Sequence, residues 1–195
     1  MVYVKCTLKK SPQSSHTQSL IEVSKAILTK KKLNIEEIQF INHQVATRVY
    51  PDMTENGWDT DEWPSLSKRI MDADVLTVGT PIWSGEKSSE GQKLIARFYA
   101  MSSQTNDKGH YIFYGKVGGC IVTDNEDGIR RFAMDLHYSL QQLGYSIPPH
   151  ADGKGEPSAK LWSYLMEGKK LDAPFGFISD FTKRSTTFMT YNLLH

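Results

Sequence analysis

The sequence has little cysteine and no long apolar run. Its 195 residues include only two cysteines, Cys6 and Cys120, and both fall in strand-like stretches, so we expect buried reduced thiols rather than a disulfide. The longest apolar stretch, Val75 to Gly85, is far shorter than the ~20 residues that a membrane-spanning helix needs. The first residues show no basic segment followed by an apolar one, so no signal peptide is expected. These absences predict a cytoplasmic protein with no membrane partner.

An excess of charge of one sign is also missing. The sequence has 23 lysine and arginine residues against 22 aspartate and glutamate residues, which leaves a net charge of +1. Such a balance gives no global field that would draw the protein to nucleic acid or to an acidic membrane surface. With 39% hydrophobic, 11% aromatic and 23% charged residues, the composition is that of a globular protein rather than a disordered chain. Any site for an anion must therefore be local.

The motifs of several common catalytic sites are absent as well. The histidines are never four residues apart and neither cysteine belongs to a C-x-x-C pair, so we predict no metal site. No G-x-S-x-G pentapeptide occurs, which argues against the nucleophile elbow of a hydrolase. The Lys30 to Lys32 run is interpreted as a solvated helix end rather than a patch for nucleic acid.

What is present is an alternation of strand-like and helix-like segments. Apolar and β-branched runs predict strands at 2–8, 37–41, 75–78, 117–123 and 145–147. Helical spacing of apolar residues predicts a first helix that carries Leu20, Val23 and Ile27, and further helices over 64–73, 89–101, 129–143, 158–167 and 177–194. Five strands that alternate with helices predict an α/β fold with a doubly wound parallel sheet, helices on both faces and right-handed crossovers.

The alternation has one long interruption, at about 43–63, which is rich in Asp, Asn, Gly and Pro and has no regular period. A loop of that length in a compact domain is usually functional, so we expect it to cover a site. No repeat and no Ser/Gly linker divides the chain. At 195 residues, against roughly 150 per domain, we predict a single domain over 1–195, with a loop excursion at about 43–63 and C-terminal helical segments at about 158–195.

Ligands of a doubly wound sheet bind beyond the carboxyl ends of the strands, so the loops after the first, third and fourth strands form the candidate site. The first loop, from Leu8 to Thr17, supplies hydroxyl groups and backbone N–H groups at the start of a helix, which suits a phosphate. The alternative is that Ser15 or Thr17 only caps the helix. The loop by itself does not decide between these two interpretations.

The other two loops differ in character. The loop from Thr80 to Ser89 is apolar and aromatic and offers a flat surface to a planar heterocycle, although Trp83 could instead be a lid on the core or a dimer contact. The loop from Thr123 to Gly128 is polar and could hydrogen-bond the edge of a ring, although Asn125 or Asp127 could simply cap the next helix. Together the three loops indicate one nucleotide-like ligand.

The residues of these loops carry a resemblance to a known family. The order Ser11-Pro12…Thr17, then Asp74…Thr80-Pro81-Ile82-Trp83…Gly85…Ser88-Ser89, then Gly115-Lys116-Val117…Thr123…Asn125-Glu126-Asp127-Gly128 resembles the NADPH-dependent FMN reductase branch of the flavodoxin-like fold, over about residues 2–150. The resemblance implies the strand order 2-1-3-4-5 and FMN as cofactor. It implies that the phosphate is held by Ser11, Ser14, Ser15, His16 and Thr17, that one side of the isoalloxazine lies against Pro81, Ile82, Trp83 and Gly85, and that the other side meets Thr123, Asp124, Asn125, Glu126 and Gly128.

The resemblance also implies the reaction and the partners. NAD(P)H would be the co-substrate, and electrons would pass through the flavin to a small acceptor such as a quinone or a free flavin. No catalytic side chain is implied, because flavin N5 carries the chemistry. Trp83, together with Tyr50 or Trp58 of the excursion, would form the wall on which the nicotinamide packs. A homodimer is expected, because flavin enzymes of this branch often complete the ring pocket across a dimer interface.

Three positions depart from the family pattern: Lys10 stands in place of a usual glycine, Gln13 in place of a frequent arginine, and Asp124 in place of a common glycine. Lys9 or Lys10 could supply the positive charge that the missing arginine would give to the phosphate. Two further function classes stay open. One is a flavodoxin-type electron carrier or flavin-binding module with no NAD(P)H turnover, and the other is a protein-interaction unit that has lost its flavin.

Overall fold

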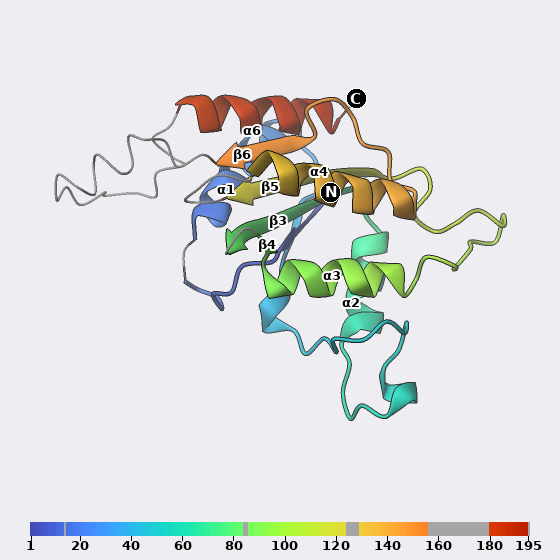
Figure 1. Cartoon of the computed structure of the whole chain (residues 1–195). Helices are drawn as coiled ribbons and strands as arrows, with labels where there is room; N and C mark the ends of the chain where they lie inside the picture. The colour runs from blue at the N-terminus through green and yellow to red at the C-terminus, as the bar shows by residue number, and fades with distance from the viewer. Residues whose placement is uncertain (14, 84–85, 124–128, 156–179, 195) are drawn as a thin grey trace.

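The computed structural model of the chain describes residues 1–13, 15–83, 86–123, 129–155 and 180–194. Figure 1 shows a central sheet with helices on both of its faces. In chain order the described elements are β1 (Val2–Lys5), α1 (His16–Lys30), β2 (Glu36–Gln39), the 3-10 helices η1 (Phe40–Asn42) and η2 (Thr54–Asn56), α2 (Trp63–Met71), β3 (Val75–Trp83), β4 (Glu86–Lys87), α3 (Ser89–Tyr99), β5 (Val117–Thr123), α4 (Ile129–Leu143), β6 (Asp152–Gly155) and α6 (Asp180–Asn192).

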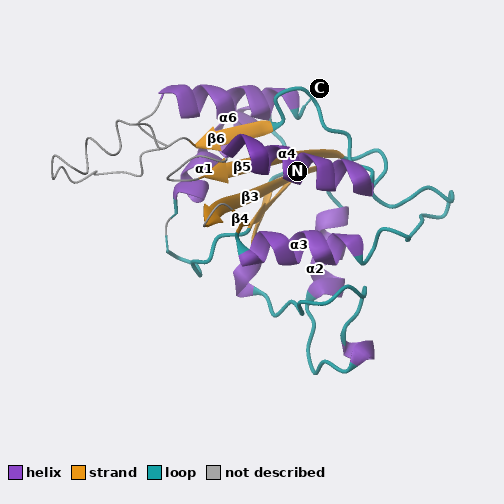
Figure 2. Ribbon diagram, in the orientation of Figure 1, coloured by secondary structure: helices purple, strands orange, loops and turns teal. Residues whose placement is uncertain are grey.

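Five of the strands form the predicted parallel sheet in the order β2-β1-β3-β5-β6, and β4 pairs antiparallel with the end of β3 (Figure 2). Counting the five parallel strands along the chain, this is the order 2-1-3-4-5, so the predicted fold class is confirmed. All five strands point the same way, which brings their carboxyl ends to one edge of the sheet (Figure 1). That edge is where doubly wound proteins bind ligands.

Alternation along the strands divides the core into two layers. Val2 and Val4 of β1 point to one face, and Tyr3 between them points to the other. The first face is covered by α2, α3 and α4, and the second by α1 and α6. Helix α6 lies close to the sheet because β5 carries glycine at position 119, where an added Cβ would come within 2.8 Å of a Leu193 methyl carbon.

The predicted strands differ from the observed ones at two places. The segment 145–147 was expected to be the fifth strand, but it makes only an isolated bridge between Ser146 and Val117. Pro148 and Pro149 follow at once and cannot donate to a ladder. The fifth strand is instead β6, a glycine-rich segment with almost no apolar signal, which pairs with β5 from Cys120↔Asp152 to Thr123↔Gly155.

The third strand is longer than the apolar run that predicted it. We expected a strand over 75–78 and a loop from Thr80 onward, but β3 continues to Trp83 and β4 returns beside it, with Ile82 opposite Lys87 and Trp83 opposite Glu86. Pro81 is accommodated within β3. The described part of the second loop of the predicted site is therefore the end of β3 together with the antiparallel β4. Of the predicted C-terminal helices, the one at 158–167 lies outside the described residues, and the one at 177–194 overlaps α6.

Residues 43–62 between η1 and α2 form the excursion, which contains η2 and extends beside α2 and α3 (Figure 1). It is anchored by a fully buried ion pair in which Arg97 donates to an Asp61 carboxylate oxygen at 2.6 Å, both side chains being 0% exposed. Arg97 lies in the last turn of α3, nine residues beyond its N-cap, about 13 Å along the helix axis. The anchored part of the excursion therefore lies beside the end of α3 that is remote from the carboxyl edge of the sheet.

Candidate active site at the carboxyl edge of the sheet

Hydrogen bonds tie the ends of β1 and β3 to the start of α3. The Cys6 N–H donates to the Gly79 carbonyl at 2.7 Å, and the Ser88 hydroxyl donates to the Cys6 carbonyl at 2.5 Å. The same Ser88 oxygen accepts from the Gly91 N–H at 3.0 Å and so caps α3. Because Ser88 is 1% exposed, it fixes the position of α3 rather than facing a ligand. Cys6 is buried as well, which raises the pKa of its thiol and keeps the thiol protonated.

The first loop leaves β1 and is braced from below by the end of β2. The Gln39 amide nitrogen donates to the Lys9 carbonyl at 2.9 Å and to the Thr7 hydroxyl at 3.0 Å. At the outer end of the loop, Asn42 donates to the Ser11 hydroxyl at 3.1 Å. The path of the loop is therefore set by two amide side chains, one at the end of β2 and one in η1, while Ser11 stays exposed at the surface.

The loop ends at the start of α1, where backbone donors face outward. Ser15 is the N-cap, and its hydroxyl oxygen accepts from the Gln18 N–H at 3.1 Å. The capping interpretation is thus correct for Ser15. In the part of the chain that the structure describes, no hydrogen bond uses the backbone N–H of His16 or Thr17. These two donors, at the positive end of the helix dipole, are available to an anion.

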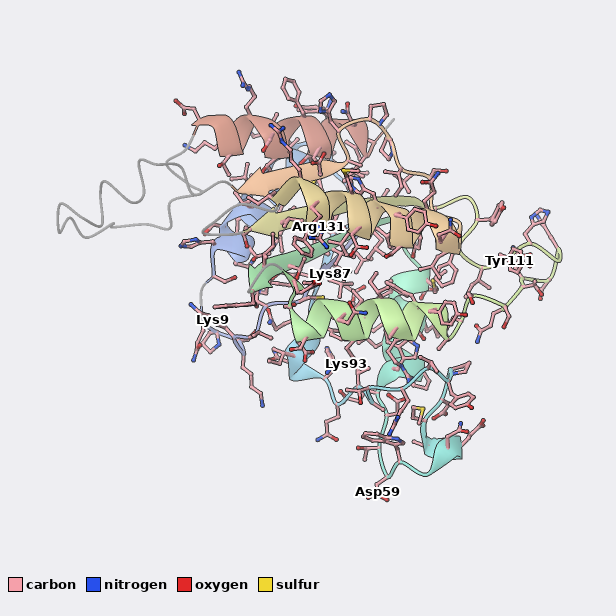
Figure 3. The ribbon with its side chains drawn as sticks, viewed as in Figure 1. Lys9, Asp59, Lys87, Lys93, Tyr111 and Arg131 are labelled. Atoms are coloured by element: carbon pink, nitrogen blue, oxygen red, sulfur yellow. The ribbon has the colours of Figure 1, made fainter. Side chains whose placement is uncertain are left out.

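Three basic residues belong to this helix start and to the loop before it. Lys9 and Lys10 are exposed on the loop, and His16 is the exposed first residue of α1 (Lys9 is labelled in Figure 3). Partial burial, together with the charge of Lys9, lowers the pKa of His16 below its ordinary value. The imidazole is therefore neutral at pH 7 in the free protein, and an anion placed beside it would raise its pKa.

One contact joins the first loop to the end of β5. The hydroxyl groups of Thr17 and Thr123 are hydrogen-bonded at 2.8 Å, and both residues are buried. Gly79 allows this approach, since a Cβ there would lie 3.0 Å from the Thr17 methyl carbon. The strand order alone places the first and last loops near one another, and this pair shows that their ends touch. Neither hydroxyl faces solvent, so the contact sets the spacing of the loops.

The β3–β4 return presents one large aromatic side chain. Trp83 is 57% exposed, whereas Ile82 is 6% exposed and Pro81 is half-buried. Trp83 is therefore not a lid on the core of its own chain. Lys87 of β4 forms an ion pair with Asp135 of α4, which fastens the return to the second turn of that helix. An exposed indole next to a backbone fixed in this way is a surface for a planar ring.

The structure thus gathers part of the predicted site. Ser11, Ser15, His16, Thr17, Pro81, Ile82, Trp83 and Thr123 come from three strand ends at one edge of the sheet. Ser14, Gly85, Asp124, Asn125, Glu126 and Gly128 lie outside the described residues. Gln39 and Asn42 were not predicted as part of the site. The edge rule points to polar residues such as Asn42 just after the second strand, but Gln39 lies within the strand itself.

The excursion does not join this set. Arg97 donates to the backbone carbonyls of Arg48 and Pro51, which flank Tyr50, so this stretch lies at the last turn of α3. In Figure 3, Asp59 and Lys9 lie in separate parts of the molecule. The expectation that Tyr50 or Trp58 lines this chain's own site is not supported by this arrangement.

Among the described residues, no helix is long and apolar enough to cross a bilayer, and no group of three or more His, Cys, Asp or Glu side chains is placed to hold a metal ion. The two cysteines are buried and unbridged, as expected.

Comparison with known proteins identifies the family of the chain. The sequence profile of the NADPH-dependent FMN reductase family matches residues 8–152, which contain the loop after β1 and the ends of β3 and β5. The chain is 31% identical over 170 residues to 8-demethyl-8-aminoriboflavin-5'-phosphate synthase of Streptomyces davaonensis, covering 84% of the chain and 65% of that protein. It superimposes with a TM-score of 0.82 and 27% identity on a crystal structure of RosB with bound 8-demethyl-8-formylriboflavin-5'-phosphate, covering 98% of this chain and 76% of that one.

A further relative is much longer than this chain. The chain is 46% identical over its whole length to part of a Mycobacterium bovis protein named divalent metal cation transporter MntH, of which it spans 28%. The match of the family profile covers most of the chain and includes the loops described above. The chain therefore belongs to the family of NADPH-dependent FMN reductases.

Proposed function

We propose that this protein is an FMN-containing oxidoreductase that takes electrons from NAD(P)H and passes them to a small acceptor such as a quinone or a free flavin. The observation that carries the proposal is the start of α1, where two N–H groups make no hydrogen bond within the described part of the chain and where Lys9, Lys10 and His16 are exposed. The exposed Trp83 ends β3 at the same edge of the sheet. One end of this edge suits a phosphate and the other suits a planar ring.

The residues present fit FMN. The N–H groups of His16 and Thr17 would donate to the phosphate, and the Ser11 and Ser15 hydroxyl groups lie on the same loop. Lys9 and Lys10 replace the positive charge of the guanidinium that family members often place near Gln13. Ser14, Gly85 and Asp124, Asn125, Glu126 and Gly128 complete the proposed set from the sequence.

The described side chains act by position rather than by proton transfer. When bound, the flavin supplies the hydride-accepting and electron-donating chemistry of the reaction. The β3–β4 return would hold the ring, and Trp83 would offer its exposed face to the ring or to the nicotinamide. Ser88 and the Thr17–Thr123 pair would keep the loops at a fixed spacing. No catalytic acid or base is assigned.

The first test is the binding of FMN. We expect FMN to bind to the protein, and binding is followed by the quenching of the flavin fluorescence. Riboflavin, which lacks the phosphate, should bind at least about tenfold more weakly. Lys10→Ala and His16→Ala should weaken FMN binding and leave riboflavin binding unchanged. Equal affinity for FMN and riboflavin would contradict the placement of the phosphate.

The second test is turnover. Anaerobic addition of NADPH or NADH to the FMN-loaded protein should bleach its yellow colour, and a quinone should restore it. A yellow protein that neither nucleotide bleaches would be an electron carrier, and a protein with no affinity for FMN would be an interaction unit.

The assembly and the compartment also belong to the proposal. We expect a homodimer, because α3 and α4 carry large exposed side chains on one face of the sheet, with Tyr99 66%, Met134 71% and Tyr138 62% exposed. Equilibrium sedimentation tests this state, and a monomer at micromolar concentration would contradict it. The two reduced, buried cysteines support a cytoplasmic setting.

A second candidate function is modification of the flavin itself. The similarity to 8-demethyl-8-aminoriboflavin-5'-phosphate synthase, and to RosB with its bound riboflavin 5'-phosphate derivative, favours a site in which FMN is a substrate rather than a resident cofactor. Mass spectrometry of the flavin after turnover decides between the two. An unchanged mass supports the oxidoreductase, and a changed ring substituent supports the second candidate.

The transporter relative suggests one further class of acceptor. A trivalent metal chelate that gains one electron would yield a divalent cation, the species named for that relative. One NADPH would reduce two ferric ions to two ferrous ions and release one proton. Ferric citrate with a ferrous-specific indicator measures this activity beside quinone reduction.

A further inference from the structure

The first turn of α4 carries two adjacent arginines that form no ion pair with any described residue. Arg130 and Arg131 are both exposed. Among the residues that the structure describes, no carboxylate lies within ion-pair distance of either guanidinium. Arg131 makes a cation–π contact with its neighbour Phe132, with the guanidinium carbon 6.0 Å from the ring centroid.

One described carboxylate near Arg131 on α4 is already paired with another cation. Asp135 lies four residues later on the same face of α4, where a carboxylate would ordinarily pair with an arginine. Asp135 is instead engaged by Lys87, whose side chain is only 9% exposed. Lys87 of β4 thus occupies the Asp135 carboxylate, which would otherwise pair with Arg131. The Arg131 guanidinium is therefore available to an anion from solution.

The position of Arg131 connects it to the proposed site. The Lys87–Asp135 ion pair places the β3–β4 return against the first two turns of α4, and Figure 3 shows Arg131 above Lys87 on this side of the molecule. The same return carries the exposed indole of Trp83, beside which the flavin and the nicotinamide are proposed to lie. A dinucleotide whose nicotinamide lies at Trp83 could extend its adenosine half toward α4.

We infer that Arg131 binds the 2'-phosphate of NADPH and makes the enzyme prefer NADPH to NADH. This inference rests on the proposed function. A guanidinium matches a phosphate with two parallel hydrogen bonds, and a dianionic phosphate gains more from it than a ribose hydroxyl does. Arg130, on the adjacent position, adds to the local positive charge.

The test compares the two nucleotides in two variants. Arg131→Ala should lower kcat/KM for NADPH about tenfold, chiefly through KM, and leave kcat/KM for NADH within about twofold. The matched control is Arg48→Ala, because Arg48 is also an exposed arginine without an ion-pair partner among the described residues, but it lies on the excursion. Arg48→Ala should change neither value.

The outcomes separate the possible roles of Arg131. An equal loss for NADPH and NADH would assign Arg131 to the pyrophosphate that both nucleotides share and would overturn the inference. No loss for either nucleotide would overturn it too. If both nucleotides are oxidised at equal rates by the unmodified protein, the inference fails while the proposed function stands.

A binding measurement makes the inference testable without turnover. Calorimetry with the FMN-loaded protein should show 2',5'-ADP binding more tightly than 5'-ADP, and Arg131→Ala should remove the difference. If neither nucleotide reduces the flavin, the proposed function fails and this titration still decides the role of Arg131. Equal binding of the two probes to the unmodified protein would refute the inference.

Discussion

Replacing Asp61 by alanine should cause the largest loss of stability available on the excursion. The Asp61 carboxylate accepts from the Arg97 guanidinium at 2.6 Å, from the N–H groups of Met53 and Trp63 at 3.1 Å each, and from that of Ala46 at 3.3 Å. Both Asp61 and Arg97 are 0% exposed. The substitution would leave a buried cation with only two carbonyl acceptors, those of Arg48 and Pro51.

The magnitude follows from these contacts. Removing one partner of a buried ion pair destabilises a protein by about 3–5 kcal/mol, because the remaining charge is left uncompensated. For a chain of 150–250 residues, each kcal/mol lowers the melting temperature by about 2–4 °C. We therefore expect Asp61→Ala to lower the melting temperature by about 6–20 °C. Asp61→Asn keeps an acceptor oxygen for the N–H groups and should lose less.

Thermal and urea unfolding, followed by circular dichroism, measure the effect. Asp59→Ala is the matched control, since Asp59 is an exposed acid on the same excursion (Figure 3) and should change stability by less than about 0.5 kcal/mol. The FMN affinity of folded Asp61→Ala should stay within about threefold of the unmodified protein, because the anchor lies at the far end of α3. A melting temperature equal to that of Asp59→Ala would refute the assigned role of the ion pair.

Three further predictions concern the site edge. His16 has a lowered pKa in the free protein, and a bound phosphate would raise that pKa, so FMN affinity should increase as the pH falls from the pKa of the bound state to that of the free state. Calorimetry across pH measures this increase. It should be absent for the His16→Asn variant and for riboflavin. Thr123→Val leaves the buried Thr17 hydroxyl without its partner and should destabilise the fold by about 1–3 kcal/mol in urea unfolding, and a neutral result would mean that Thr17 finds another partner. Gly79→Ala places a Cβ 3.0 Å from Thr17 and 3.2 Å from Ile21, so it should lower stability by about 1–3 kcal/mol and weaken FMN binding, and unchanged values for both would show that α1 can shift freely.

The pattern of the residues was enough to predict the doubly wound parallel sheet, and the resemblance to the family supplied its strand order. The alternation of Val2, Tyr3 and Val4 is visible without a structure, because side chains of a strand point to opposite faces in turn. The helical spacing in 129–143 predicted α4 with the bounds that the structure has, Ile129–Leu143. The edge rule for doubly wound sheets then predicts from the sequence that Ser15, His16 and Trp83 lie at the ligand-binding edge.

The contacts that join distant parts of the chain were not predictable in this way. The glycine-rich β6 is a strand because β5 supplies its ladder partners, and its composition carries no signal of its own. Asp61 and Arg97 are 36 residues apart, and nothing in either neighbourhood marks them as partners. The same is true of Lys87 and Asp135, whose pairing decides which cation is left for a ligand.

Local sequence determined the helices and strands other than β6, because strand and helix periods are properties of neighbouring residues. The positions of the strand ends then determined which loops form the candidate site. Only the tertiary structure decided that the Thr17 and Thr123 hydroxyl groups meet, that Trp83 faces outward and that the excursion is anchored at the remote end of α3. It also decided that Asp135 pairs with Lys87. Each of these depends on the spacing of groups brought together by folding, and Coulomb and hydrogen-bond energies depend on that spacing rather than on separation along the chain.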